Sequence, residues 1–240
     1  MTLQGGRYAA ESLKLIATSI RSFLGFAWMS GWTTSDLRGA VGPVVVHRSG
    51  RLPRALPLED VQRLLASADR RTTMGVRDYA LMLLLFRLGL RAGEVASLRL
   101  DDIDWEAATI TARVKGGGRR TFPIPQDVGQ AVVAYLRQRP GDATRREVFL
   151  QVRSSQGCMN SSAVTQVVAR NAARAGLGTV RAHRLRHSAA RAVLAGGGTL
   201  AEVGELLGHR TAEVTMVYAS LDLSSLRALV RPWPVEVDDA

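Results

Sequence analysis

Residues 77–94 read RDYALMLLLFRLGLRAGE, and this stretch decides the fold. Positions 80–86 are apolar nearly all round, which is typical of a helix at the centre of a core. Gly89 ends this predicted helix, and RAGE at 91–94 opens a second, shorter one. An arginine directly after the most apolar helix is poorly explained as surface decoration. The stretch therefore predicts a helical domain with Arg91 as a candidate functional residue beside its core.

Other segments repeat apolar residues every three or four positions, as amphipathic helices do. They predict helices at residues 8–30, 58–68, 127–138 and 161–175. Residues 109–114 instead alternate and are β-branched, 116–118 are three glycines, and 121–125 return as a second strand, which predicts a β-hairpin. The predicted fold class is mainly α with a small β-hairpin or sheet insertion (α+β).

The chain carries 32 Lys and Arg against 21 Asp and Glu, a formal net charge of +11. This excess favours a polyanionic partner such as nucleic acid, although a general preference for arginine is the alternative. Only Lys14 and Lys115 are lysines. A lysine kept in such a chain indicates a role that guanidinium cannot fill, such as proton donation, and chance retention is the competing interpretation.

The single Cys158 excludes an internal disulfide and a cysteine-built metal site, which fits a cytoplasmic protein. Residues 13–32 form the most apolar early run, but Lys14 and Arg21 interrupt it and its apolar positions follow a helical spacing. This pattern predicts an amphipathic helix and no membrane span.

Three of the four histidines fall in the last third of the chain, where the sequence predicts short helices separated by glycine. His183 and Arg186 form a His-x-x-Arg pair, His209 ends the run Leu-Leu-Gly-His, and Tyr218 follows nine residues later. Arginine and histidine suit phosphate binding and proton transfer near neutral pH. The stretch is therefore a candidate catalytic site.

Taken in order, Arg91, Lys115 on the hairpin, the His183 pair, His209 and Tyr218 resemble the tyrosine recombinases of the phage integrase family. Lys115 lies 24 residues after Arg91, in agreement with the family spacing. The resemblance runs from about residue 52 to 230 and implies that 58–230 is a tyrosine recombinase catalytic domain. The sequence departs from the usual hairpin pattern in having Val114 before the lysine and three glycines after it.

The resemblance implies a role for each matched residue in DNA strand cleavage without a metal or other cofactor. Tyr218 is the expected nucleophile, which forms a 3′-phosphotyrosine and preserves the bond energy for rejoining. Arg91 and Arg186 are expected to clamp the non-bridging phosphate oxygens. Lys115 is expected to protonate the leaving 5′ oxygen.

His183 and His209 complete the expected set, as imidazoles that assist proton transfer. The implied partners are double-stranded DNA and three further copies in a homotetramer on synapsed sites, with no membrane and no small-molecule substrate. Residues 221–230 are predicted to form a last amphipathic helix that packs on a neighbouring protomer in such an assembly. The implied function is site-specific recombination, the integration, excision or transposition of a mobile element.

The N-terminal part is shorter than the resemblance leads one to expect. Residues 1–48 are interpreted as a partial helical core-binding domain, 49–57 as a proline-containing linker, and 231–240 as an acidic tail. We expect exposed apolar side chains such as Phe23 and Trp28, because the partner helices are missing through truncation or an upstream start. A type IB topoisomerase-like nicking-closing enzyme and a truncated, non-cleaving DNA-binding or inhibitory protein are the alternatives.

Overall fold

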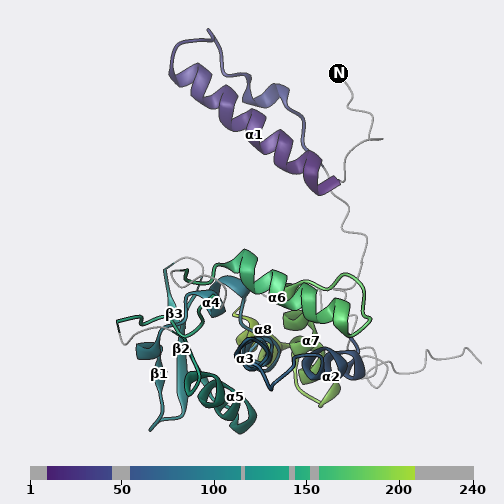
Figure 1. The fold of residues 1–240 in the computed structure, drawn as a ribbon. Helices are drawn as coiled ribbons and strands as arrows, with labels where there is room; N and C mark the ends of the chain where they lie inside the picture. Colours follow the sequence, from purple (N-terminus) through teal and green to yellow (C-terminus); the bar gives the residue numbers. More distant parts are fainter. Residues whose placement is uncertain (1–9, 45–54, 115–116, 141–143, 152–156, 209–240) are drawn as a thin grey trace, which may run out of the picture. The chain divides into compact units, whose positions relative to one another are not determined.

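A computed structural model of the chain describes residues 10–44, 55–114, 117–140, 144–151 and 157–208 (Figure 1). The chain divides into two compact units, Met1–Arg51 and Leu52–Ala240. The candidate residues Lys115, His209 and Tyr218 lie outside the described residues, as do the predicted helix 221–230, the tail 231–240 and most of the predicted linker.

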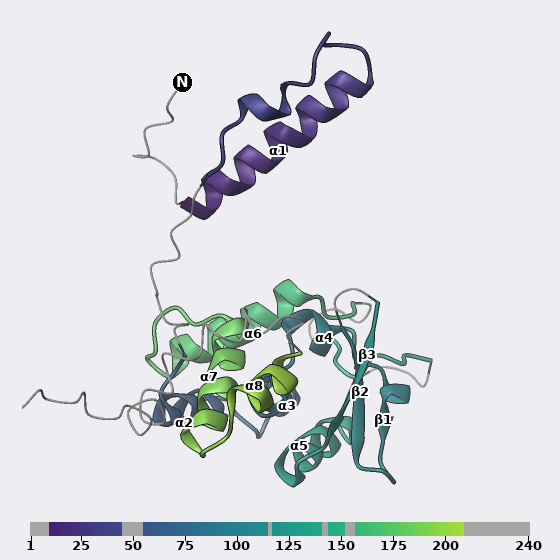
Figure 2. The same ribbon diagram turned by 180° about the vertical axis from the view of Figure 1, so that it is seen from behind.

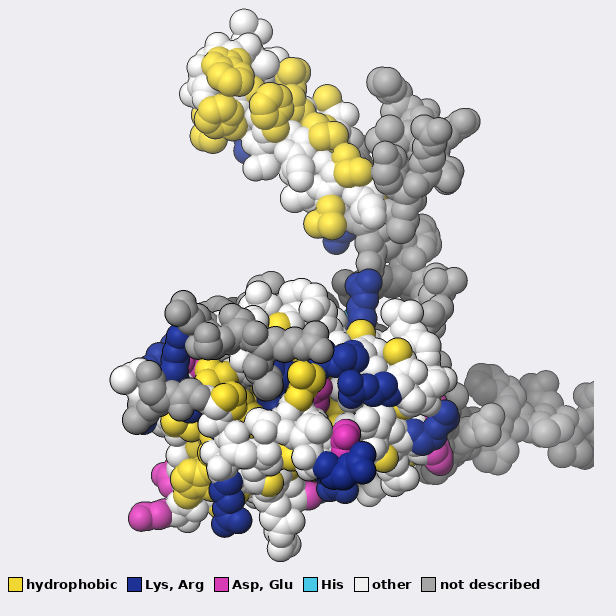
Figure 3. Space-filling view, in the orientation of Figure 1, with side chains coloured by type: hydrophobic (Ala, Val, Ile, Leu, Met, Phe, Trp, Pro, Cys, Tyr) yellow, Lys and Arg dark blue, Asp and Glu magenta, His cyan; other side chains and the backbone are white. Residues whose placement is uncertain are grey.

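Unit 1 consists of a long helix, α1 (Ala10–Met29), and a short 3₁₀ helix, η1 (Leu37–Ala40), that folds back on it. The Arg21 guanidinium of α1 binds the segment after η1, donating to the carbonyls of Val41 at 3.1 Å and Gly42 at 2.8 Å. Apolar side chains remain exposed along α1, as predicted (Figure 3). The exposed large apolar residues of this unit are Leu15, Ile16, Ile20, Phe23, Phe26, Trp28, Met29, Trp32 and Leu37.

Some of these aromatic side chains contact one another or a cation within unit 1. The rings of Phe26 and Trp32 meet edge to face at 5.4 Å, and the Arg38 guanidinium lies 5.6 Å from the Trp28 ring centroid. The buried residues of α1 are small ones such as Ala17 and Ala27, so this unit encloses little apolar surface by itself.

Unit 2 is built from seven described α-helices, a 3₁₀ helix, η2 (Leu100–Asp102), and a small sheet. The helices are α2 (Leu58–Ala66), α3 (Thr73–Arg87), α4 (Ala92–Ala96), α5 (Gln126–Leu136), α6 (Ser161–Arg174), α7 (Ala182–Ala195) and α8 (Leu200–Leu207). The apolar α3 contacts α2, α4, α5, α6 and α7, and residues 80–85 of it are almost completely buried. The prediction of a central helix is confirmed. Within the part of the chain that the structure describes, no helix is both long and apolar enough to cross a membrane.

Helix α3 begins four residues before the predicted Arg77, at Thr73. Thr72 provides the cap, because its side-chain oxygen accepts from the backbone N–H of Gly75 at 3.0 Å. Gly75 packs so tightly on the preceding turn that a Cβ would collide with the Asp69 carbonyl. The capped first turn, Thr73-Met74-Gly75-Val76, thus extends the helix before its long apolar run.

The sheet has the order β1-β2-β3 and is antiparallel throughout, with β1 (Ile103–Asp104), β2 (Thr109–Arg113) and β3 (Arg119–Pro123). Ile110 pairs with Phe122 in the register of β2 and β3, and both side chains are buried. The hairpin and the fold class are confirmed, while β1 was not predicted. Figure 2 shows the sheet at one end of unit 2, and α4 contacts β2.

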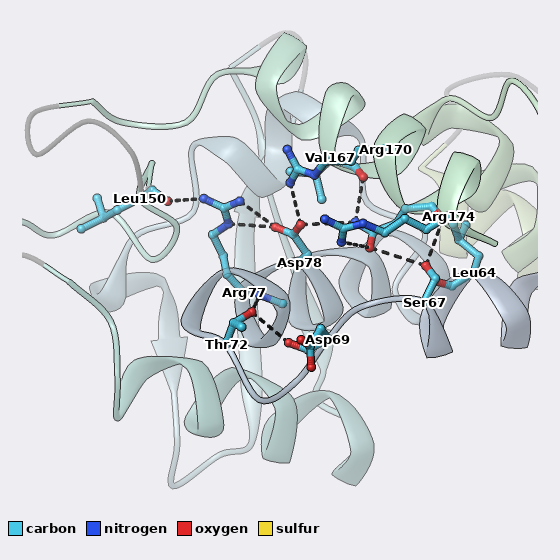
Figure 4. A network of polar contacts seen from close by, with 12 residues as sticks. Leu64, Ser67, Asp69, Thr72, Arg77, Asp78, Leu150, Val167, Arg170 and Arg174 are labelled. Atoms are coloured by element: carbon cyan, nitrogen blue, oxygen red, sulfur yellow. Dashed lines mark hydrogen bonds and ion pairs between the residues drawn. The ribbon is translucent and has the colours of Figure 1, made fainter.

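Buried polar side chains connect α3 to α6 through the carboxylate of Asp78, which is fully buried (Figure 4). Asp78 accepts from Arg77 and Arg170 at 2.7 Å each and from Asn171 at 3.2 Å. Arg77 also donates to the carbonyl of Leu150 at 3.0 Å. We call these residues the Asp78 network; it balances a buried charge and fixes the segment before position 151 against α3.

Candidate active site

Arg91 is placed by the turn that joins α3 to α4. Gly89 adopts a left-handed backbone with φ of +58°, Leu90 is fully buried, and Arg91 then occupies the N-cap position of α4. The Glu94 carboxylate accepts from the Arg91 backbone N–H at 2.8 Å and from its Nη1 at 2.7 Å. Glu94 is buried whereas the Arg91 side chain is 39% exposed, so the carboxylate orients a guanidinium that a ligand can reach.

Arg186 and His183 come from α7 and lie on one face of it, three residues apart. The Arg186 side chain is buried, with the residue 8% exposed. Its Nη1 donates to the carbonyl of Gly89 and its Nη2 to the carbonyl of Leu207, the last residue of α8. Arg186 therefore joins the ends of α3 and α8 and is held beside the turn that carries Arg91.

His183 meets a second histidine on the same helix. Its ring lies 5.8 Å from that of His187, at an interplanar angle of 86°. Partial burial lowers the pKa of His183, and the nearby charges of Arg181 and Arg184 lower it further. The lowered pKa favours the neutral imidazole, which can accept a proton or a hydrogen bond.

These side chains converge on one open hollow of about 630 Å³. Its walls come from the end of β2, from α4, from the first turns of α6 and from α7. The lining residues are Leu90, Arg91, Ala92, Gly93, Glu94, Arg113, Val114, Ser161, Thr165, Ala182, His183, Arg186 and His187. Arg91 is thus brought together with His183 and Arg186, which lie far from it in the sequence.

The charges around the hollow favour an anion. Arg91, Arg113 and Arg186 line it, and Glu94 is the one carboxylate among its described lining residues. Positive charge in a partly buried hollow attracts phosphate more strongly than the same charge in water. Val114, which precedes Lys115 in the sequence, also lines the hollow.

Three residues of this region were not predicted. His187 could have been found from its i, i+4 relation to His183, and Arg113 from its place at the end of the hairpin strand. Arg120 of β3 donates to the carbonyl of Glu205 in α8. Burial lowers the pKa of Arg120 and the charge of Arg91 adds to this, whereas the Glu94 and Glu205 carboxylates oppose it. No local sequence signal indicates the contact between Arg120 and the Glu205 carbonyl.

A metal site has no candidate in the described part of the chain. Nowhere among residues 10–44, 55–114, 117–140, 144–151 and 157–208 do three His, Cys, Asp or Glu side chains gather closely enough to share an ion.

Comparison with known proteins connects this geometry to one family. Residues 54–224 match the phage integrase family. A putative integrase/recombinase of Sinorhizobium fredii, y4rA, is 47% identical over 228 residues, which cover 93% of this chain and 55% of that protein. The chain therefore spans about half the length of this relative.

Two further proteins are similar over most of the chain. The tyrosine recombinase XerD of Mycobacterium tuberculosis is 34% identical over 229 residues, 91% of this chain and 72% of that protein. The crystal structure of the XerH site-specific recombinase in a post-cleavage complex with its palindromic difH substrate has a TM-score of 0.66 at 23% identity. The match covers 80% of this chain and 56% of that one, and it shows a shared fold.

Proposed function

The chain belongs to the phage integrase family, and we propose that it performs site-specific DNA recombination by cleaving and rejoining strands through a 3′-phosphotyrosine intermediate. The observation that carries the proposal is the convergence of Arg91, His183 and Arg186 on one cationic hollow. The net charge of +11 favours DNA as the partner. The relatives named integrase/recombinase and tyrosine recombinase support the same reaction.

In the proposed reaction, the Tyr218 hydroxyl attacks the scissile phosphorus, and the bond from phosphorus to the 5′ oxygen breaks. The phenolic proton passes to a neutral imidazole, for which His183 and His209 are the candidates. Lys115 supplies a proton to the leaving 5′ oxygen. A 5′ hydroxyl of a second strand then reverses these transfers, so that no external energy source is needed.

Arg91 and Arg186 stabilise the charge that develops on the non-bridging oxygens. A planar guanidinium can donate two parallel N–H bonds to a phosphate, and donors fixed before the reaction cost no reorganisation during it. Arg91 is held by Glu94 at 2.7 Å, and Arg186 by the two backbone carbonyls. Both are therefore oriented before DNA binds, as a transition-state clamp requires.

We further propose that strand exchange takes place in a homotetramer on two synapsed DNA sites, which supplies four tyrosines for four strands. A nicking-closing enzyme of the topoisomerase type needs only one protomer on one duplex. Crosslinking of the DNA-bound protein distinguishes these two assemblies.

Trapping on a nicked suicide substrate tests the chemistry. After cleavage, the short fragment that carries the free 5′ hydroxyl diffuses away, so rejoining is prevented. A covalent protein–DNA adduct should therefore accumulate with the wild-type chain and be absent with Tyr218→Phe. Binding without an adduct in the wild type would instead support the non-cleaving DNA-binding alternative.

A further inference from the structure

The last turn of α8 is bound by two arginines from different elements. Arg186 of α7 donates through Nη2 to the carbonyl of Leu207, and Arg120 of β3 donates through Nη2 to the carbonyl of Glu205. The final carbonyls of a helix carry partial negative charge, so guanidinium groups suit them, even at Glu205, whose carbonyl also accepts from the backbone N–H of Gly208 at 3.1 Å. Arg120 and Arg186 therefore both bind carbonyls at the same end of α8.

Arg120 is itself fixed from two sides. Its guanidinium carbon lies 4.7 Å from the centroid of the Phe122 ring, which is buried in the sheet. Against it also lies Gly208, the C-cap of α8, in a left-handed backbone with φ of +57°. A Cβ at Gly208 would collide with Nη1 of Arg120 and approach its Cζ to 3.0 Å. The left-handed backbone favours glycine, and a side chain at this position would push the guanidinium of Arg120 aside.

We propose that Arg120 is a positioning residue, which holds the end of α8 against the hairpin and thereby keeps Arg186 in place to bind the scissile phosphate. This inference rests on the DNA cleavage proposed above. If the end of α8 moves away from β3, Arg186 loses its contact with the Leu207 carbonyl. A displacement of about 1 Å at a reacting centre can cost on the order of 10²-fold in rate.

The neighbouring Arg119 offers a matched control on the same strand. Its Nη2 binds the Asp102 carboxylate at 2.9 Å, and its side chain is 57% exposed. It thus has the same charge as Arg120 and lies on the same strand, but its guanidinium binds Asp102. Substitution of either arginine by methionine removes one positive charge while keeping an unbranched apolar stem.

The experiment measures single-turnover cleavage of the suicide substrate at saturating DNA, with the full chain. We expect Arg120→Met to be slower on the order of 10²-fold, and Arg119→Met to stay within about twofold of wild type. Arg120→Lys, which keeps one donor for the Glu205 carbonyl, should recover part of the loss. Equal rates for Arg120→Met and Arg119→Met would overturn the proposal.

A second substrate separates positioning from general damage to the fold. Replacement of one non-bridging oxygen of the scissile phosphate by a methyl group removes the charge that Arg186 stabilises. The deficit of Arg120→Met should shrink about tenfold or more on this neutral substrate, whereas damage to the fold would slow both substrates alike. An equal deficit on both substrates would contradict only the positioning role of Arg120. A wild-type chain that forms no adduct would contradict the proposed function as well.

Discussion

The Asp78 network and the hollow around Arg91 both gather arginines, but they treat the charge differently. In the network, a fully buried carboxylate accepts from Arg77 and Arg170 at 2.7 Å each, so the buried Arg77 has its counter-charge inside the protein. In the hollow, Arg186 binds neutral backbone carbonyls, and Glu94 is the carboxylate that holds Arg91. Arg77 of the network is enclosed together with its counter-charge, whereas Arg91 is paired with Glu94 but leaves 39% of its side chain open to a ligand.

The largest effect is expected from removing the carboxylate of the Asp78 network. Asp78→Ala leaves the buried Arg77 without its counter-charge, so we expect the free energy of unfolding to fall by about 3–5 kcal/mol. Chemical denaturation measures this change. The control is Asp60→Ala, which removes an exposed ion pair with Arg63 (3.0 Å) and should cost about 1 kcal/mol or less. Equal losses for the two variants would show that the network does not stabilise the fold.

A substitution in the hollow should lower the rate of DNA cleavage and change the free energy of unfolding little. Arg91→Lys keeps a cation beside Glu94 but loses the planar pair of donors, so cleavage should slow on the order of 10²- to 10³-fold. Single-turnover adduct formation gives the rate, and a parallel denaturation curve gives the stability. A variant that cleaves at the wild-type rate would remove Arg91 from the phosphate clamp.

The smallest expected effect is a shift of pH dependence at His183. Burial, with the charges of Arg181 and Arg184, lowers the pKa of this imidazole. If its neutral form takes part in cleavage, the rate is full above the ordinary histidine pKa and falls only as the pH drops through the lowered value. Stability has the same sign, because protonation of the partly buried ring disfavours the folded state.

Arg181→Gln removes one of those charges, so the acid limb of the rate profile should move upward in pH. Arg191→Gln removes a charge of the same helix that is not among the causes of the shift, and should leave the limb in place. Identical profiles for wild type and Arg181→Gln would show that His183 does not control the acid limb.

The sequence predicted those parts of the fold that local patterns encode. The apolar run of α3 and the alternation with three glycines in the hairpin were sufficient for a central helix and two strands. Strand β1 escaped prediction because it has only two residues and is defined by pairing with Ile110 and Thr109. The start of α3 was placed too late because the cap at Thr72 lies outside the apolar run.

The sequence by itself also determined which residue types are available for phosphate chemistry, and the family resemblance gave their order along the chain. Only the tertiary structure decided which of them meet. Arg186 lies 97 residues from Gly89, and Arg120 lies 85 residues from Glu205, so neither contact follows from helical or strand periodicity. Such contacts form because packing brings helix ends beside other elements, and the last carbonyls then bind the donors that lie nearby. The structure thus added Arg113 and His187 to the lining of the hollow and placed Arg120 against the end of α8.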